Sequence, residues 1–160
     1  MIGRVFAASL VVCAAGAATA ECREDAVALR GPFGTAQFSV EIADDSEERA
    51  RGLMFVEDLP RSAGMLFLYD RPSSQSFWMK NTLIPLDMLF IRPDGTVQHV
   101  HENAVPGDLT PISGGEGVLA VLEINGGLAG QLGIEAGAEV RHPAFGADAA
   151  WPCAEAPGAE

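Results

Sequence analysis

The sequence predicts a mainly β protein, a single sandwich or barrel-like domain with one or two short helices. Between residues 36 and 142, short runs of alternating apolar and polar residues are separated by Pro, Gly, Asn and Asp, a pattern typical of small β domains. No repeat or linker divides the 160 residues, a length that supports one hydrophobic core. We therefore expect an N-terminal tail over 21–35, a β domain over 36–142 and a C-terminal tail over 143–160.

The strand candidates follow from this alternation. In Gln37–Ile42, the apolar residues at alternate positions share one face. Pro93-Asp94-Gly95 predicts a turn, because proline fixes φ and glycine accepts a positive φ. Leu86–Ile91 and Val97–Glu102 on either side of this turn are therefore expected to form a hairpin. The other strand candidates are Met65–Leu68, Ser76–Met79, Val118–Ile124 and Glu139–His142.

Two short helices are expected between the strands. Asp45 followed by Glu48 resembles a capping box at a helix start. A second helix is expected to begin at Asn125 and to end at Gly133, where Ile134 can fold back onto the helix. The Pro- and Gly-rich segment 106–117 is expected to be a long surface loop.

Residues 1–20 have the pattern of a cleavable secretory signal. Arg4 precedes an apolar stretch from Val5 to Ala18, and Ala18-Thr19-Ala20 is the small-x-small pattern that signal peptidase reads. The stretch is short for a bilayer span and no stop-transfer pattern follows it. We expect cleavage between Ala20 and Glu21, release into the periplasm or the medium, and no stable membrane anchor.

Charge and cysteine content narrow the function classes. A formal net charge of −12 argues against nucleic-acid partners and against docking on anionic lipid. After cleavage Cys22 and Cys153 remain, and such a pair in an oxidising compartment favours a disulfide. This bond would close a loop of about 130 residues and contribute about 4–5 kcal/mol on the chain-entropy model. We expect no cofactor, since an exported domain does not meet cytosolic nucleotides.

A family resemblance rests on four ordered blocks, Arg51–Phe55, Gly64–Phe67, Phe77–Thr82 and Pro85–Phe90. With their spacing they resemble domain-of-unknown-function family 192, an uncharacterised prokaryotic family. The resemblance extends from about Phe38 to Arg141. It implies a compact, mainly β sandwich or barrel-like fold with a short helix after the first strand, and it implies no established reaction. Members of the family often carry an export signal.

Two acidic residues within apolar strands are the catalytic candidates. Asp87 and Glu123 each lie between apolar neighbours, where an ionised carboxylate is costly unless it is paired or faces water. As an acid/base pair they would suit a hydrolase acting on envelope carbohydrate. Alternatively, Arg51 neutralises one of them, or each lies on a solvated face. Arg51 can also pair with Glu47 on its own helix.

The ligand-binding candidates are Arg51, Trp78, Asn81, Thr82, Asp87 and Glu123. Trp78 beside the polar Asn81 and Thr82 could provide a stacking platform for a sugar ring, or it could pack in the core. The function we expect is a ligand-binding or scaffolding module. Its partner would be a small molecule, a carbohydrate or an envelope protein.

A copper-binding protein is the other alternative. His99 and His101 alternate on a strand and so point to one face. Together with the thioether of Met79 they could bind Cu(I). Against this hypothesis, the methionines are single and scattered among Leu and Phe residues, as methionines that fill a core commonly are.

Overall fold

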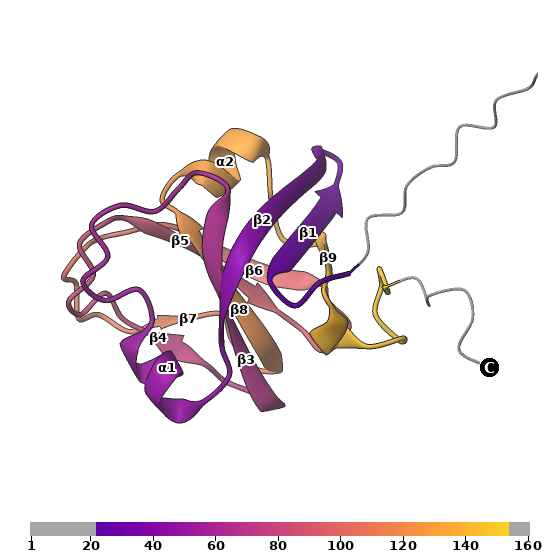
Figure 1. Ribbon diagram of the computed structural model, residues 1–160, viewed down its shortest axis with the longest axis horizontal. Coiled ribbons are helices and arrows are strands. Elements are labelled where there is room, and N and C mark those ends of the chain that lie inside the picture. Colours follow the sequence, from indigo (N-terminus) through magenta and orange to yellow (C-terminus); the bar gives the residue numbers. More distant parts are fainter. Residues whose placement is uncertain (1–21, 154–160) are drawn as a thin grey trace, which may run out of the picture.

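The computed structural model describes residues 22–153, so the expected signal peptide and its cleavage site lie outside the described residues. The fold is mainly β, as predicted (Figure 1). Seven strands form one sheet: β1 (Ala26–Gly31), β2 (Gly34–Ala43), β3 (Ala63–Ser73), β5 (Leu86–Ile91), β6 (Val97–Ala104), β8 (Val118–Asn125) and β9 (Glu139–Arg141). A two-stranded ribbon of β4 (Ser76–Phe77) and β7 (Ile112–Ser113), helices α1 (Ser46–Arg51) and α2 (Leu128–Leu132), and a 3-10 turn (Pro143–Phe145) complete it.

The large sheet curls into a half-barrel with the strand order β6-β5-β8-β3-β2-β1-β9. Its two ends approach each other, because Thr96 at the β5–β6 turn bridges to Glu139 in β9. The Val140 amide also donates to the Gly95 carbonyl at 2.8 Å. Gly95 has φ +77°, and a Cβ there would lie 2.8 Å from the Val140 carbonyl oxygen. Glycine is therefore required where the curled sheet comes back onto its own turn.

Both faces of the sheet are covered, so the domain has two hydrophobic clusters. The concave cluster includes Leu66, Leu89 and Leu122, and α2 closes it. The convex cluster contains the neighbours of these residues in the same strands, whose side chains point to the other face of the sheet. It also contains Leu53, which follows α1, and Met79. Strand β8 lies in the middle of the sheet and is buried on both faces. A polar side chain in β8 therefore points into one of the two clusters.

Most expected elements are present, with shifted ends. Strands β5 and β6 pair as the predicted antiparallel hairpin. The capping box of α1 is confirmed, with Asp45 accepting from the Glu47 and Glu48 amides at 2.8 Å each. Helix α2 begins at Leu128 rather than at Asn125, because Asn125 remains paired in β8. Its end is as predicted, with the amide of Ile134 donating to the Ala129 carbonyl at 2.9 Å.

Segments expected to be tails and loops contain ordered structure. Strand β1 lies within the expected N-terminal tail 21–35 and pairs with both β2 and β9. In the expected C-terminal tail, Phe145 and Ala149 are buried. The expected surface loop 106–117 contains β7, which pairs with β4. Strand β1 forms a hairpin with the neighbouring β2 and also pairs with the distant β9, whereas β7 takes its partner β4 from an earlier part of the chain.

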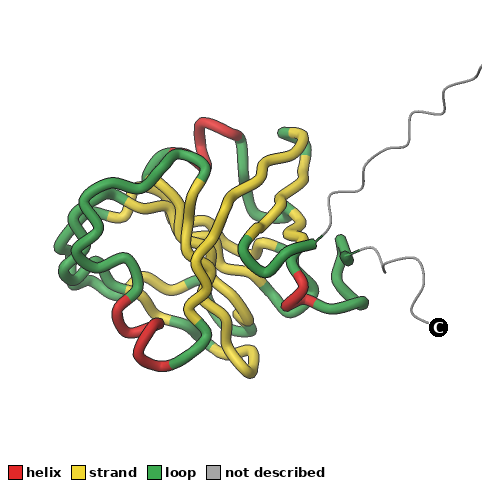
Figure 2. The backbone as a smooth tube through the Cα atoms, viewed as in Figure 1, coloured by secondary structure: helices red, strands yellow, loops and turns green. Residues whose placement is uncertain are grey.

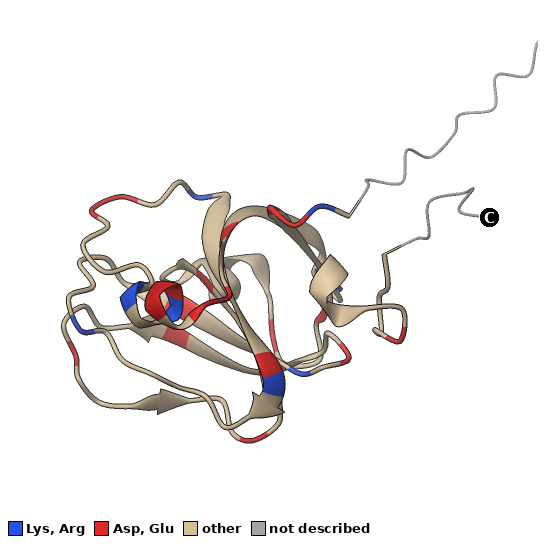
Figure 3. Ribbon diagram, turned by 60° about the horizontal axis from the view of Figure 1, so that its bottom comes forward, with Lys and Arg blue, Asp and Glu red and all other residues tan. Residues whose placement is uncertain are grey.

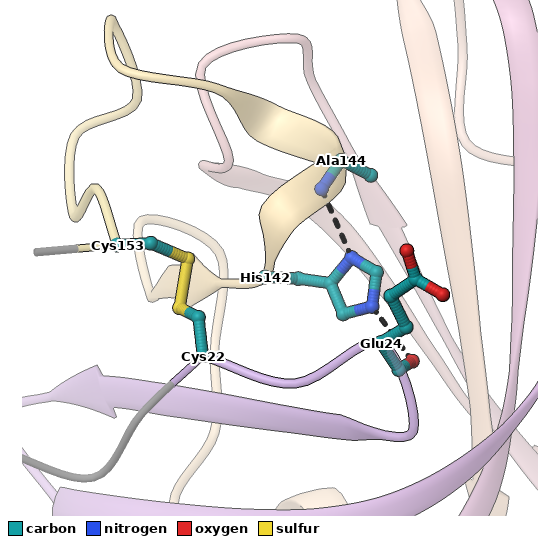
Figure 4. Close-up of a disulfide and its surroundings, with 5 residues drawn as sticks. All are labelled: Cys22, Glu24, His142, Ala144 and Cys153. Carbon is teal, nitrogen blue, oxygen red and sulfur yellow. Dashed lines mark hydrogen bonds between the residues drawn. A yellow bond between two sulfur atoms is a disulfide. The ribbon is translucent and has the colours of Figure 1, made fainter. Parts of the chain in front are cut away.

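The two ends of the described chain are joined. Cys22 and Cys153 form the expected disulfide, with 5.6 Å between their Cα atoms. Figure 4 shows His142 beside this bond, with its Nε2 atom 2.9 Å from the Glu24 carbonyl and its Nδ1 atom accepting from the Ala144 amide at 3.2 Å. Within residues 22–153, no helix is long and apolar enough to cross a bilayer.

Candidate functional site

Asp87 and Glu123 do not form a pair. In the register of β5 and β8, Asp87 lies opposite Ile124 and Met88 lies opposite Glu123. Because successive side chains alternate between faces, Asp87 points to the concave side with Ile124 and Glu123 to the convex side with Met88. The acid/base pair considered from the sequence is therefore wrong. The two carboxyl groups cannot meet one substrate.

Asp87 has a structural role. Its side chain is fully buried and accepts three backbone hydrogen bonds, from Asn103 at 2.8 Å, Gly127 at 2.7 Å and Ala129 at 2.7 Å. Helix α2 has Gly127 as its N-cap and no side-chain cap of its own. Asp87 thus supplies the missing cap from a neighbouring strand and joins α2 to the sheet.

Glu123 has the opposite environment. It lies between Met65 of β3 and Met88 of β5 and is only 4% exposed. No hydrogen bond or ion pair to its carboxyl group is found in the described part of the chain. Burial raises the pKa of Glu123 to about 8, so the carboxyl group is mostly protonated at neutral pH. Arg51 does not neutralise it.

Glu123 faces a pocket of about 260 Å³ between α1, β3 and β4. The apolar wall is formed by Leu53, Met54, Phe67, Phe77 and Trp78, and the polar groups come from Arg49, Arg51, Tyr69, Ser76, Thr82 and Glu123. Gly52 ends α1 with φ +48° and lies where a Cβ would be 3.1 Å from the Phe67 ring. This close approach brings the end of α1 against the sheet and forms one side of the pocket.

Arg49 and Tyr69 hold each other in place on this side. The guanidinium of Arg49 lies 5.1 Å from the centre of the Tyr69 ring and donates to the Leu68 carbonyl at 2.8 Å and to the Asp44 carbonyl. Burial raises the pKa of Tyr69 to about 12, partly opposed by the Arg49 charge, so its hydroxyl is protonated. Neither residue was a candidate from the sequence. The only signal was that Tyr69 follows the apolar run Met65–Leu68 and is the one tyrosine in the chain.

Arg51 lies on the mouth of the pocket and is exposed. Its expected helix partner Glu47 does not contact it in a salt bridge, since the ion pairs between described residues are Arg23–Asp25 and Arg30–Glu139. Figure 3 shows α1 as a short helix carrying both acidic and basic residues. The Arg51 guanidinium thus has no carboxylate partner within residues 22–153.

The segment Trp78–Thr82 forms the other rim. Trp78 is 48% exposed rather than packed in the core, and the Lys80 ammonium lies 5.0 Å from its ring centre. Asn81 adopts a positive φ of 55° and accepts the Phe55 amide at 2.9 Å through its carbonyl. Its side chain reaches Met54 rather than the pocket. Thr82 is buried and lines the pocket.

The proposed copper ligands do not share an accessible site. Met79 is fully buried in the convex cluster. His99 is exposed on β6, with its ring 5.9 Å from that of Phe90, and His101 lies opposite Met88. Nowhere in residues 22–153 do three or more His, Cys, Asp or Glu side chains group as metal ligands.

Of the six ligand-binding candidates, the structure therefore brings Arg51, Trp78, Thr82 and Glu123 to one pocket and leaves out Asn81 and Asp87. Residues 29–142 match the family DUF192, described as "Uncharacterized ACR". The chain belongs to this family. The DUF192 match covers more than half of the chain and spans the whole pocket.

Two solved structures are similar to this DUF192 chain. One is a protein of unknown function from Novosphingobium aromaticivorans DSM 12444, with 47% identity and a TM-score of 0.71 over 72% of this chain and 82% of that chain. The other is a proposed transcription regulator from Sinorhizobium meliloti 1021, with 39% identity and a TM-score of 0.71 over 76% of this chain and 95% of that one. None of the curated proteins matches the chain.

Proposed function

We propose that this DUF192 protein is an exported binding domain that holds a small polar ligand in the Glu123 pocket. The observation that supports it is the carboxyl group of Glu123, almost fully buried, facing a cavity and without a hydrogen-bond partner in the described chain. No fully buried side-chain oxygen of the described residues lacks a hydrogen-bond partner, so the carboxyl group of Glu123 is reached from the pocket. A ligand there can form the hydrogen bonds that the described chain does not supply.

The pocket lining suits a compact ligand with hydroxyl or amide groups. A protonated Glu123 offers one donor and one acceptor, and the hydroxyls of Tyr69 and Thr82 can do the same. Trp78 and Met54 provide apolar contact at the rim. The volume of about 260 Å³ holds roughly nine water molecules at liquid density, so the bound group is smaller than a drug-sized molecule.

The residues that line the pocket suit a ligand-binding site better than the catalytic site of a hydrolase. Glycoside hydrolysis uses two carboxyl groups flanking the scissile bond, and Glu123 is the only acid among the lining residues. The lining also contains no His or Cys that could serve as a base or a nucleophile. A hydrolase that uses Asp87 with Glu123 is not consistent with the opposite faces of the two side chains.

Export is part of the same proposal. It is supported by the signal-like pattern of residues 1–20 and by the disulfide that joins Cys22 to Cys153, because such bonds persist in oxidising compartments. The ligand would then be a compound of the periplasm or of the medium.

A thermal-shift and NMR screen of the exported protein tests the binding proposal. The panel contains glucose, N-acetylglucosamine, acetamide, glucuronate and benzoate. We expect at least one compound to raise the melting temperature and to perturb the indole signal of Trp78. Glu123→Leu should abolish the effect, whereas Glu116→Gln, which changes an exposed acid outside the pocket, should leave it intact. If no compound shifts either signal, the binding proposal fails and a protein-directed scaffolding role takes its place.

A further inference from the structure

The charge on the pocket lining is opposite to the charge of the chain. The sequence carries a formal net charge of −12. The ionisable residues that line the pocket are Arg49, Arg51, Tyr69 and Glu123. At neutral pH the hydroxyl of Tyr69 and the carboxyl group of Glu123 are mostly protonated, so the two guanidinium groups carry the charge of the lining.

Neither guanidinium forms a salt bridge with a carboxylate of residues 22–153. Arg49 donates to the backbone carbonyls of Asp44 and Leu68, which satisfies part of its hydrogen-bonding capacity and leaves its charge uncompensated. Arg51 is exposed at the mouth and forms no salt bridge with any described residue. In a strongly acidic chain, a pocket that presents two unneutralised arginines favours an anion.

The neutral acid and the two cations belong to different parts of the pocket. Burial alone accounts for the raised pKa of Glu123, whereas a guanidinium in close contact would lower that pKa. Glu123 projects from β8 of the sheet and is 4% exposed, whereas Arg51, the last residue of α1, is exposed at the mouth. The cavity between them can hold a ligand that has a charged end and an uncharged polar end.

We infer that the pocket binds a small organic anion, with its carboxylate or phosphate group against Arg51 and an uncharged oxygen or nitrogen of the same molecule hydrogen-bonded to Glu123. This inference rests on the proposed function and adds the class of its ligand. A guanidinium can donate two parallel hydrogen bonds to a carboxylate or a phosphate. Arg49, fixed by its backbone contacts, adds a second positive charge along the same wall.

In this arrangement the affinity for an anion depends on whether Glu123 is protonated. Ionisation of Glu123 would place a negative charge in the cavity beside the bound anion, and like charges repel. The groups that face Glu123 across the pocket are Arg49 and Arg51 from α1 and Tyr69 from β3, while Ser76 from β4 and Thr82 carry no charge. Anion affinity is therefore expected to fall as the pH rises through about 8, the pKa of Glu123.

Matched pairs of ligands test the inference. Affinities of the exported protein for glucuronate and glucose, and for benzoate and benzamide, are measured by isothermal titration calorimetry at pH 7 and pH 9. Glucose 6-phosphate distinguishes a preference for phosphate from one for carboxylate. We expect the charged member of at least one pair to bind about tenfold or more tightly than its neutral partner. That preference should be lower at pH 9.

Three variants locate the effect. Arg51→Ala should weaken anion binding about tenfold or more while changing the neutral partner by less than about twofold. Arg71→Ala removes one positive charge from an exposed position outside the lining of this pocket and should leave the anion preference unchanged. Glu123→Gln keeps an uncharged hydrogen-bonding group and should bind the anion with equal affinity at both pH values.

The outcomes separate the two proposals. Equal binding of charged and neutral partners, or an anion preference that Arg71→Ala removes as fully as Arg51→Ala does, overturns the anion assignment and leaves the binding function standing. Absence of binding by every compound in this set and in the wider panel overturns both proposals. If glucose 6-phosphate alone is preferred over glucose, the ligand is a phosphate monoester and the assignment to Arg51 holds.

Discussion

Asp87 and Glu123 come from the neighbouring strands β5 and β8 and point to opposite faces of the same sheet. The first is surrounded by backbone amides and the second by apolar side chains. From this difference we propose a role in stability for Asp87 and a role in binding for Glu123. The first two predictions below follow from it.

Asp87→Asn should destabilise the fold without altering the pocket. The amide has one oxygen in place of two, so at least one of the three backbone donors at Asn103, Gly127 and Ala129 loses its acceptor. We expect a loss of about 2–4 kcal/mol in the free energy of unfolding, measured by urea titration. Asp70→Asn changes an exposed carboxylate and should cost less than about 0.5 kcal/mol. Equal effects of the two variants would argue against the capping role.

Glu123→Gln should stabilise the protein at high pH and not at low pH. The pKa of Glu123 is raised from 4.5 to about 8 in the folded state, so the folded protein holds a proton that the unfolded chain releases. The contribution of this group is fully present below pH 4.5 and is lost as the pH rises toward 8. At pH 8 the variant should exceed the wild type by roughly 3–5 kcal/mol in free energy of unfolding.

Urea unfolding of both proteins from pH 4.5 to 8.5 measures this difference, and subtraction cancels the groups that they share. A constant difference over this range would show that Glu123 titrates normally. Carbon-detected NMR of the Glu123 carboxyl group provides an independent value of its pKa.

His142 should make the protein sensitive to acid. Burial lowers the pKa of His142, and this effect is partly opposed by the hydrogen bond to the Glu24 carbonyl and by the charge of Glu24 (Figure 4). The unfolded chain therefore takes up a proton at a higher pH than the folded chain does. Stability from this residue is present above about pH 6.5 and decreases as the pH falls below it.

Thermal unfolding of the wild type and of His142→Gln between pH 7.5 and pH 5 measures how the stability of each protein changes with pH. The stability of the wild type should fall more steeply toward pH 5 than that of the variant. Parallel curves would exclude His142 as the acid-sensitive group. His99→Gln, a change at an exposed histidine, is the matched control and should leave the slope as in the wild type.

The disulfide that joins the two ends of the described chain should contribute strongly to the free energy of unfolding. Replacing Cys22 and Cys153 with serine should lower the free energy of unfolding by about 4–5 kcal/mol on the chain-entropy model. Intact mass before and after reduction should differ by the two thiol hydrogens, and free thiols in the exported protein would contradict the bond. Arg30, which donates to Glu139 at 2.6 Å and lies 4.7 Å from the Trp151 ring centre, remains as a contact between these segments in the variant.

The sequence predicted elements whose signals lie within a few residues. The β5–β6 hairpin follows from its turn at Pro93–Gly95, and the start of α1 follows from Asp45 and Glu48. The sequence prediction missed β7, whose partner β4 lies far from it along the chain. It also missed β1, which forms a hairpin with β2 and pairs with the distant β9. Figure 2 shows long loops at one end of the sheet and further loops near the two ends of the described chain, where local patterns carry little information.

The candidate site was only partly accessible from the sequence. Glu123 and Thr82 stood out because they are polar residues in or next to apolar runs. Arg49 and Tyr69 did not, because an arginine on a short helix and a tyrosine next to an apolar run are ordinary features. Their importance arises from a contact between α1 and β3, which the turn at Gly52 makes possible.

The sequence by itself determined the mainly β class, the family and the pair of cysteines, since composition, spacing and alternation encode these directly. It also placed two acids in buried strands, because the residues around Asp87 and Glu123 are nearly all apolar. Which face each acid occupies was decided by the tertiary structure, because the register between two strands depends on the packing of the whole sheet. That register places Asp87 beneath α2 as its cap and leaves Glu123 uncharged on the floor of a pocket with Arg51 at its mouth.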